Sequence, residues 1–215
     1  MPDTDSLFSQ IPDTGPDFSI EEGLFSEGKK AVAGVDEAGR GPLAGPVVAA
    51  AVILDPDNIP NGLNDSKKLT EISRETLFQN ILETSYVSWA SLPASVIDKI
   101  NIREASLSAM TTSVQQLPIK ADAAIIDGRD VPSDLLEIGR AYVKGDARSL
   151  SISAASIVAK VTRDQIMKRA AQCFPQYGFE RHKGYGSKSH RLAIDELGPC
   201  PIHRMTFSPM KNLRI

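Results

Sequence analysis

Hydrophobic and polar positions along the chain predict a mixed α/β fold. Short apolar runs between turn signals predict buried strands at residues 31–35, 47–54 and 123–126. Two further segments read as strands, residues 86–92 and 138–144. Helical spacing of apolar residues predicts helices over residues 18–30, 70–83, 94–117 in two pieces, 149–174 and 189–197. Strands and helices mixed in this order predict one sheet with helices packed against it.

The longest predicted helix, residues 149–174, has the clearest buried face. Its first half consists of small residues, which let a helix lie close against a sheet. Its expected buried stripe is Ile152, Ala155, Ala159, Ile166 and Ala170. Its basic residues are expected to face solvent or phosphate, namely Lys160, Arg163, Lys168 and Arg169. In the helical pair over 94–117, the expected inward stripe is Ile100, Leu107, Met110 and Val114.

The composition fits one globular domain with a short extension. The chain has 215 residues, of which 41% are hydrophobic and 24% charged. Residues 1–17 contain three prolines and four aspartates, so we expect a disordered extension there and a domain over 18–215. No run of 18 apolar residues occurs and the N-terminus is acidic, which predicts a cytoplasmic protein without a membrane partner. Cys173 and Cys200 are too far apart for a zinc or redox motif and are expected to be small core residues.

Charge is distributed unevenly along the chain. Residues 1–143 hold 11 Lys and Arg against 22 Asp and Glu, whereas residues 144–215 hold 13 against 5. The two parts therefore carry −11 and +8, which sum to the net charge of −3. This asymmetry predicts that the C-terminal third faces a polyanion while the acidic residues gather elsewhere, some of them around metal.

Two adjacent carboxylates and a glycine turn stand at the end of the first predicted strand. Asp36 and Glu37 follow the apolar run, and Gly39, Arg40 and Gly41 come next. A phosphate-binding P-loop is disfavoured, because Arg40-Gly41 stands where Lys-Ser/Thr is required. A dinucleotide-binding fingerprint is disfavoured too, because its glycine spacing is one residue out of step and prolines replace its helix. A solvated turn with two unconnected acids is the remaining structural alternative.

Two more acids stand at predicted strand ends. Asp127 follows the run 123–126, and Asp146 follows the segment 138–144. Four oxygen ligands without a nearby His or Cys select Mg²⁺ or Mn²⁺ over zinc. Such a set suits two-metal hydrolysis of a phosphodiester, which needs no protein nucleophile. Because consecutive strand residues point to opposite faces, either the strand ends before Glu37 or one of the first two acids reaches the metal from another side.

Basic and aromatic residues supply candidate nucleic-acid contacts. Lys67 and Lys68 lie in a predicted loop, where they either touch phosphate or are simply solvated. Residues 181–191 contain no acid and place Tyr185 between two glycines, which suits stacking on a sugar or base better than burial in a core. The pair His203-Arg204 is interpreted as a packing contact of the tail and not as a catalytic pair.

Taken together, these motifs resemble bacterial ribonuclease HII, the type 2 ribonuclease H. The resemblance covers residues 18–210 and follows the order GVDEAGRGPLAGPVV, NDSKKL, IIDG, VKGDA, ISAASIVAKVTRD, KGYG and GPCPIHRMTF. It implies a ribonuclease H-like mixed β-sheet flanked by helices, with a helical C-terminal part.

The resemblance also implies roles for individual residues. The family's four catalytic, metal-binding acids map to Asp36, Glu37, Asp127 and Asp146. Its substrate-binding positions map to Gly39, Arg40 and Gly41, which read the ribose 2′-hydroxyl through the backbone, and to Lys67, Tyr185 and Ser187. Ser187 stands where the family usually has threonine, and it keeps the hydroxyl.

The implied activity is hydrolysis of RNA in RNA/DNA hybrids, including cleavage 5′ of a single ribonucleotide in duplex DNA. The reaction leaves 3′-OH and 5′-phosphate ends and requires two Mn²⁺ or Mg²⁺ ions. The protein is expected to be a monomer. One alternative is a ribonuclease HIII-like enzyme, which usually has an extra N-terminal domain and a lysine in place of Arg40. The other is a non-catalytic duplex-binding module, although a binder has no reason to gather carboxylates near a polyanion.

Overall fold

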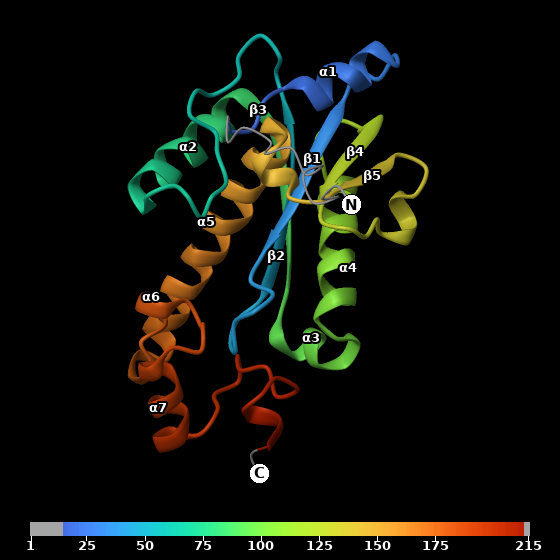
Figure 1. Cartoon of the computed structure of the whole chain (residues 1–215). Helices are drawn as coiled ribbons and strands as arrows, with labels where there is room; N and C mark the ends of the chain where they lie inside the picture. Colours follow the sequence, from blue (N-terminus) through green and yellow to red (C-terminus); the bar gives the residue numbers. More distant parts are fainter. Residues whose placement is uncertain (1–14, 213–215) are drawn as a thin grey trace, which may run out of the picture.

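A five-stranded mixed sheet forms the centre of the computed structural model, which describes residues 15–212 (Figure 1). The strands lie in the order β3-β2-β1-β4-β5. They are β1 (Val32–Ala38), β2 (Val47–Leu54), β3 (Ser85–Leu92), β4 (Ala123–Asp127) and β5 (Gly139–Tyr142). The first three strands pair antiparallel, and β4 and β5 run parallel to β1. The predicted fold class is therefore confirmed.

Helices cover both faces of the sheet (Figure 1). They are α1 (Ser19–Ser26), α2 (Glu71–Thr84), α3 (Ala94–Ile100), α4 (Ile102–Gln115), α5 (Leu150–Cys173), α6 (Phe179–His182) and α7 (Lys188–Leu197). Helix α4 packs on one face, and α5 with α2 packs on the other. The lower end of α5, α6, α7 and the C-terminal segment surround the loop between β1 and β2 (Figure 1). This arrangement is the expected helical C-terminal part.

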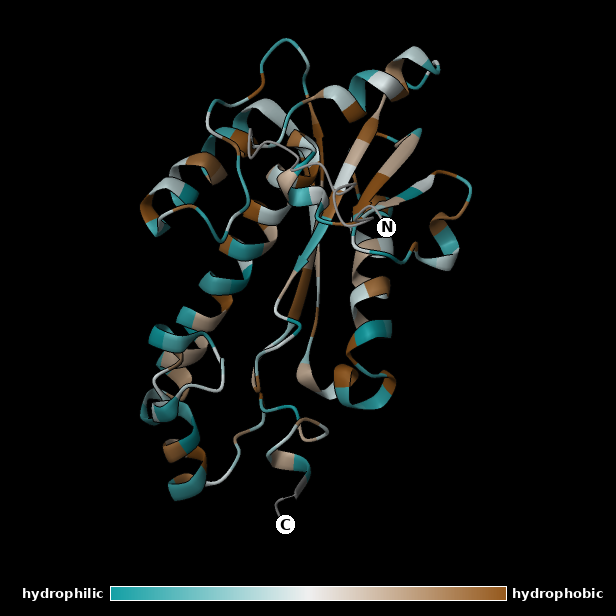
Figure 2. Cartoon of the chain, in the orientation of Figure 1, coloured by the Kyte–Doolittle hydropathy of each residue, from teal (hydrophilic) through white to brown (hydrophobic). Residues whose placement is uncertain are grey.

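The alternation of side chains along β1 separates two apolar cores. Ala33 and Val35 pack under α4, whereas Val32 and Gly34 face α1 and α5. Strand β2 is buried over its whole length, as its uninterrupted apolar sequence predicts. Figure 2 shows brown, hydrophobic segments along these strands and teal segments on the outer sides of the helices. The polar end of β1 is thus the exception in an otherwise apolar sheet.

The N-terminal turns of α5 lie directly on β1 at Gly34. A Cβ atom on Gly34 would be 2.1 Å from the carbonyl carbon of Ser151 and 2.4 Å from the amide nitrogen of Ile152. Both contacts are to main chain, so the neighbour has no flexible side chain to move aside. The predicted close approach of the small-residue helix to the sheet is confirmed, and it depends on the absence of a side chain at Gly34.

Several expectations about single positions are wrong. Arg163 is 1% exposed instead of facing solvent, because it lies on the stripe of α5 that packs against the β1–β2 loop. Ile100 is 39% exposed, because α3 ends there and the chain turns at Asn101 into α4. Cys173 is exposed at the last turn of α5 and is not a core residue. Asp146 does not end a strand, since β5 stops at Tyr142.

The structure covers only part of the expected N-terminal extension over residues 1–17. Residues 1–14 lie outside the described residues, and Asp17 forms a parallel bridge with Ser149 just before α5. Within residues 15–212, none of the helices combines the length and the apolar character needed to cross a bilayer.

Candidate active site

The first two acids occupy opposite faces of β1. The strand continues to Ala38, so it does not end before Glu37. Asp36 points to the α5 face and is 6% exposed, whereas Glu37 follows Val35 on the α4 face and is half-buried. The main-chain N–H of Glu37 donates to Asp36 Oδ1 at 2.6 Å. The alternative in which the strand ends before Glu37 is therefore wrong, and the two acids leave β1 on opposite faces.

The third and fourth acids are linked by a short turn. Asp127 ends β4, and its Oδ1 accepts a hydrogen bond from the N–H of Gly145 at 2.7 Å. Gly145 begins the 3₁₀ turn Gly145–Ala147, which presents Asp146 from a position 7% exposed. A Cβ on Gly145 would meet Ile152 Cδ1 at 2.6 Å and Asp127 Oδ1 at 3.4 Å. Asp127 therefore fixes the turn that delivers Asp146.

Burial and mutual repulsion mark these acids as one electrostatic group. Burial, followed by the charges of Glu37, Asp127 and Asp146, raises the pKa of Asp36 well above its usual value. The pKa of Asp146 is raised by burial and then by Asp127. Burial also raises the pKa of Glu37, although Arg40 opposes this shift. Each carboxylate therefore favours a nearby positive charge.

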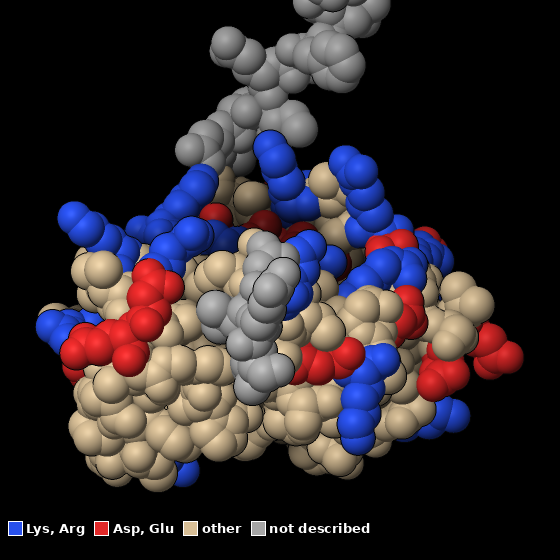
Figure 3. Space-filling view, turned by 90° about the horizontal axis from the view of Figure 1, so that it is seen from below, with Lys and Arg blue, Asp and Glu red and all other residues tan. Residues whose placement is uncertain are grey.

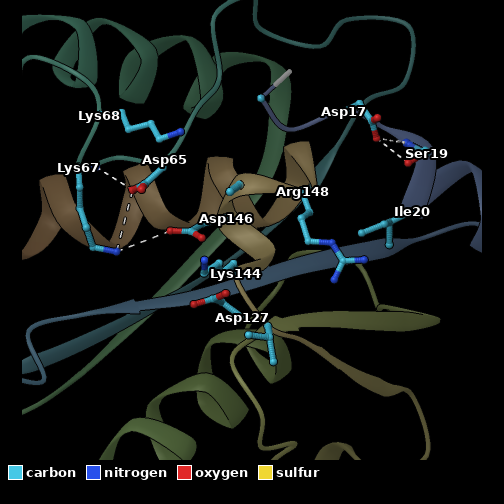
Figure 4. Close-up of a pocket in the computed structure, with 13 residues that line it drawn as sticks. Asp17, Ser19, Ile20, Asp65, Lys67, Lys68, Asp127, Lys144, Asp146 and Arg148 are labelled. Atoms are coloured by element: carbon cyan, nitrogen blue, oxygen red, sulfur yellow. Dashed lines mark hydrogen bonds and ion pairs between the residues drawn. The ribbon is translucent and has the colours of Figure 1, made fainter. Parts of the chain in front are cut away.

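Lysine and arginine side chains supply that charge in part. Arg40 Nη1 lies 3.2 Å from Glu37 Oε1. Lys67 Nζ lies 3.6 Å from Asp146 Oδ2 (Figure 4). Lys67 also lies 4.0 Å from Asp65, an acid that the sequence did not single out. Among the residues described, no three acidic, His or Cys side chains are close enough to enclose a metal ion. Two of the four predicted acids are turned toward cationic side chains instead.

A recess of about 800 Å³ opens beside Asp127 and Asp146, whereas Asp36 and Glu37 are not among the residues that line it. Asp127 and Asp146 line it together with Asp65 (Figure 4). Its basic lining residues are Lys67, Lys68, Lys144 and Arg148. In Figure 3, Lys and Arg side chains stand around a hollow in which acidic side chains are set deeper. The rim can attract a polyanion while the floor attracts cations.

The donor set fits a hard divalent cation. All four candidate ligands are carboxylates, and the three with raised pKa values are held close to like charges. A divalent cation relieves this repulsion, and Mg²⁺ and Mn²⁺ prefer such oxygen ligands.

The glycine turn leaves the sheet next to the acids. Gly39 has φ +97°, a conformation that glycine adopts without strain. Gly41 is exposed, and a Cβ there would meet only the ring of Tyr185, at 4.0 Å. Among the described residues, the main-chain N–H groups of Gly39, Arg40 and Gly41 donate no hydrogen bond. Arg40 and Gly41 are exposed, so their N–H groups are available to a molecule that approaches from the side of Tyr185, whereas Gly39 is buried.

Tyr185 is held by its main chain and presents its ring. It follows α6 in the loop before α7 and is 47% exposed. Its N–H donates to the carbonyl of His182 at 2.8 Å. Ser187 caps α7, because its Oγ accepts from the N–H of His190 at 3.2 Å. The structure thus places Tyr185 beside Gly41 and gives the Ser187 hydroxyl a helix-capping contact.

All three histidines of the chain lie in one cluster behind Tyr185. The N–H of Cys200 donates to His203 Nδ1 at 2.9 Å, and His203 Nε2 lies 3.0 Å from His190 Nε2. His190 Nδ1 lies 2.9 Å from the carbonyl of Tyr185. Neutral rings satisfy these three contacts when His203 donates through Nε2 and His190 donates through Nδ1. The cluster therefore supports Tyr185 while its imidazoles are uncharged, in agreement with the packing role expected for His203.

The histidine cluster predicts a loss of stability in acid. Burial and the neighbouring His190 lower the pKa of His203 from 6.5 to about 4. The folded state therefore binds this proton less readily than the unfolded state. The contribution of neutral His203 to the free energy of unfolding is complete above pH 6.5 and is lost as pH falls toward 4. A shift of this size corresponds to about 3 kcal/mol. We expect His203→Gln to flatten the dependence of the urea unfolding midpoint on pH between 7.5 and 4.5. An unchanged slope would contradict this assignment.

Sequence reasoning missed the roles of Asp65 and Arg163, and it predicted a packing contact for Arg204 without its partners. Asp65 was not considered, because its loop was interpreted only through the possible phosphate contacts of Lys67 and Lys68. Arg204 is fully buried beneath the glycine turn, and its isolated position in a proline-rich tail gives no local signal of that contact. Arg163 did have a signal, because it stands four residues after Ala159 on the buried stripe.

The fold and the acidic site define the class of protein, a ribonuclease H-like hydrolase. The crystal structure of the ribonuclease H2 from Pyrococcus horikoshii OT3 superposes with a TM-score of 0.73 and 30% identity, covering 85% of this chain and 96% of that one. A family model described as Ribonuclease HII matches residues 33–210. The chain belongs to the ribonuclease HII family.

Curated relatives agree with this assignment over nearly the full chain. Ribonuclease HII of Agrobacterium fabrum is 56% identical over 211 residues, which cover 98% of this chain and 97% of the relative. Ribonuclease HII of Brucella anthropi is 58% identical over 208 residues, covering 96% and 94%. As a member of this family, the chain is a metal-dependent ribonuclease H endonuclease.

Proposed function

We propose that the protein cleaves the RNA strand of RNA/DNA hybrids and cuts 5′ of single ribonucleotides embedded in duplex DNA, leaving 3′-OH and 5′-phosphate ends. The observation that supports this most directly is the juxtaposition of acids and unpaired glycine amides. Asp36 ends the buried part of β1, and the free N–H groups of Gly39 to Gly41 begin three residues later. Chemistry on a phosphate and recognition of the adjoining sugar are thus built into one segment.

The four acids are proposed to be the catalytic and metal-binding residues. When bound, two Mg²⁺ or Mn²⁺ ions supply an activated water and neutralise the charge that develops on the phosphate. Asp36, Asp127 and Asp146 approach from the α5 side of the sheet end, and Glu37 approaches from the other face. Lys67 and Arg40 hold Asp146 and Glu37 at 3.6 and 3.2 Å. Each cationic side chain is free to turn toward a phosphate once its acid has another partner.

Recognition of the substrate is proposed to use the sugar as well as the phosphates. The N–H groups of Gly39, Arg40 and Gly41 suit a 2′-hydroxyl, which is the group that distinguishes RNA from DNA. The exposed ring of Tyr185 lies beside Gly41 and suits stacking on the sugar or base. Arg40, Lys67 and Ser187 complete the proposed substrate-binding residues. The protein is proposed to act as a cytoplasmic monomer.

The test is cleavage of labelled duplexes that differ in one hydroxyl. One duplex contains a single ribonucleotide and the other is all DNA, and each is incubated with Mg²⁺, with Mn²⁺ and with chelator. We expect metal-dependent cutting only on the 5′ side of the ribonucleotide. Equal cutting of both duplexes would refute sugar recognition by Gly39 to Gly41. Cutting of neither would refute the single-ribonucleotide duplex as a substrate. A control duplex with a continuous RNA strand paired to DNA then shows whether the protein has any ribonuclease H activity.

Replacement of Tyr185 by alanine is expected to lower kcat/KM for the single-ribonucleotide duplex by about 10- to 100-fold. Loss of one stacking contact corresponds to about 1–3 kcal/mol. Tyr185→Phe keeps the ring and should retain most of the activity. Tyr86→Ala is the matched control, because Tyr86 is 49% exposed on the edge strand β3, away from the acids. Equal kinetics for Tyr185→Ala and Tyr86→Ala would remove Tyr185 from the site.

A further inference from the structure

Two buried arginines lie directly beneath the glycine turn. Arg163 from α5 is 1% exposed and Arg204 from the C-terminal segment is fully buried. Among the described residues, neither guanidinium lies within ion-pair distance of a carboxylate. A buried cation without a counterion is unfavourable unless other groups compensate it. The compensating groups here are main-chain carbonyls, and nearly all of them belong to the β1–β2 loop.

Arg204 binds both ends of this loop. Its Nη2 donates to the carbonyl of Gly39 at 2.5 Å and its Nη1 donates to that of Arg40 at 2.8 Å. Its Nε donates to the carbonyl of Gly45 at 3.0 Å. One planar guanidinium therefore joins the first two residues of the turn to the point where the chain re-enters the sheet. A lysine ammonium cannot reproduce this flat, three-point geometry.

Arg163 holds the adjoining carbonyls and extends the contact to the loop of Tyr185. It donates to Pro46 at 2.9 Å, to Ala44 at 3.1 Å and to Lys183 at 3.0 Å. Its guanidinium carbon lies 5.9 Å from the centre of the Tyr185 ring. A Cβ on Gly39 would be only 2.1 Å from Arg163 Nε. Gly39 is thus needed on its inner side for Arg163, whereas Gly41 is open on its outer side.

The two arginines decide which groups of the turn remain available. The carbonyls of Gly39 and Arg40 point inward to Arg204, while the N–H groups of Gly39 to Gly41 donate to no described residue. We propose that Arg163 and Arg204 are positioning residues that fix these amides for the ribose 2′-hydroxyl and thereby set the discrimination between ribonucleotide and deoxyribonucleotide. This inference rests on the proposed function, in which the glycine turn reads the sugar.

The charge of the arginines supports the same role. Burial, and then the nearby Arg163, lowers the pKa of Arg204 to about 9, so the side chain remains cationic at neutral pH. A cation that donates to a carbonyl polarises the peptide group, and the N–H on its far side becomes a stronger donor. The turn is therefore both fixed and made more attractive to a hydroxyl or phosphate oxygen.

The test compares discrimination in Arg204→Lys and Arg163→Lys with the wild-type chain. Discrimination is the inhibition constant of an all-DNA competitor duplex divided by the KM for the same duplex with one ribonucleotide, measured with Mg²⁺ at least 15 °C below each Tm. Met110→Ala is the control, because Met110 is a buried residue of α4 on the other side of the sheet and its truncation destabilises the fold without touching the turn. Arg140→Lys controls for the change of residue type at an exposed site.

We expect each buried Arg→Lys variant to lower the discrimination ratio at least tenfold, chiefly through KM, while both controls keep the wild-type ratio. An unchanged ratio in folded Arg204→Lys and Arg163→Lys would overturn the inference, because both arginines would then be purely structural. If Arg204→Lys does not fold, Arg163→Lys decides by the same criterion. The discrimination ratio of the wild-type chain is measured first. A value near one would refute sugar recognition itself, before any variant is compared.

Discussion

Replacement of Asp36 by asparagine is expected to abolish cleavage and, in the absence of metal, to stabilise the protein. Asp36 is the most buried of the four acids, and three like charges surround it. Loss of one carboxylate from a site that binds metal should remove several kcal/mol of transition-state stabilisation, so kcat should fall by about a thousandfold or more. Binding of an RNA/DNA hybrid depends mainly on the basic rim and should survive.

The gain in stability follows from the sign of the pKa shift. The pKa of Asp36 is raised in the folded state. Its favourable contribution to the free energy of unfolding is therefore complete below the pKa of the unfolded state and is lost as pH rises through the pKa of the folded state. At pH 7, which lies above the unfolded pKa, the carboxyl group therefore opposes folding, and a neutral amide of the same shape does not. A rise of about 2–4 °C in Tm is expected for each 1 kcal/mol gained.

Measurements of turnover, hybrid binding and Tm on one preparation test all parts of this prediction. Asp57→Asn is the matched control, since Asp57 is exposed in the turn after β2 and should change none of the three. Added Mg²⁺ or Mn²⁺ should raise the Tm of the wild-type chain more than that of Asp36→Asn. Loss of binding with intact cleavage would refute the catalytic assignment. A lower Tm in chelator would refute the electrostatic argument.

Gly34→Ala is expected to produce the largest loss of stability of any substitution considered. The added Cβ would overlap the main chain of Ser151 at 2.1 Å, so the whole N-terminal part of α5 must move away from β1. Overpacking against a rigid neighbour should cost about 3 kcal/mol or more, which is a fall of about 6–12 °C in Tm. The acids on β1 and in the turn before α5 would separate, so activity should also fall at temperatures where the chain remains folded.

Thermal unfolding and low-temperature kinetics check this prediction. Gly23→Ala is the control, because a Cβ on Gly23 in α1 meets nothing within 4 Å. Alanine is also the better helix former, so this control should be neutral or slightly stabilising. A Tm for Gly34→Ala within 2 °C of the wild type would show that α5 can move from β1 without penalty.

Much of the fold was predictable because its signals are local. The apolar run 47–54 forms β2 with the same bounds, and Thr70 caps α2 through a hydrogen bond from the N–H of Ser73. The positions of Asp36 and Asp127 near the ends of neighbouring strands were predictable from the apolar runs that precede them. The turn that carries Asp146 was not predictable, since Asp146 is the fourth residue after the last residue of β5.

The buried arginines show where sequence reasoning failed. Arg163 was assigned to solvent because it is charged, although the helical period places it on the buried stripe. Residue type was given more weight than position. Arg204 could not be placed from sequence at all, because its partners Gly39 and Arg40 are 165 and 164 residues away. Only the tertiary fold brings these groups together.

That separation has a consequence for the order in which the molecule becomes competent during translation. Asp36 and the glycine turn are synthesised early, whereas Arg204 is added near the end. Contacts of such long sequence range form late, because the entropy of closing the intervening chain must first be overcome. A nascent chain still attached to the ribosome at residue 200 would contain all four acids but not the side chain that holds the carbonyls of Gly39 and Arg40. The glycine turn therefore gains the contacts of Arg204 only after more than 160 further residues have been synthesised.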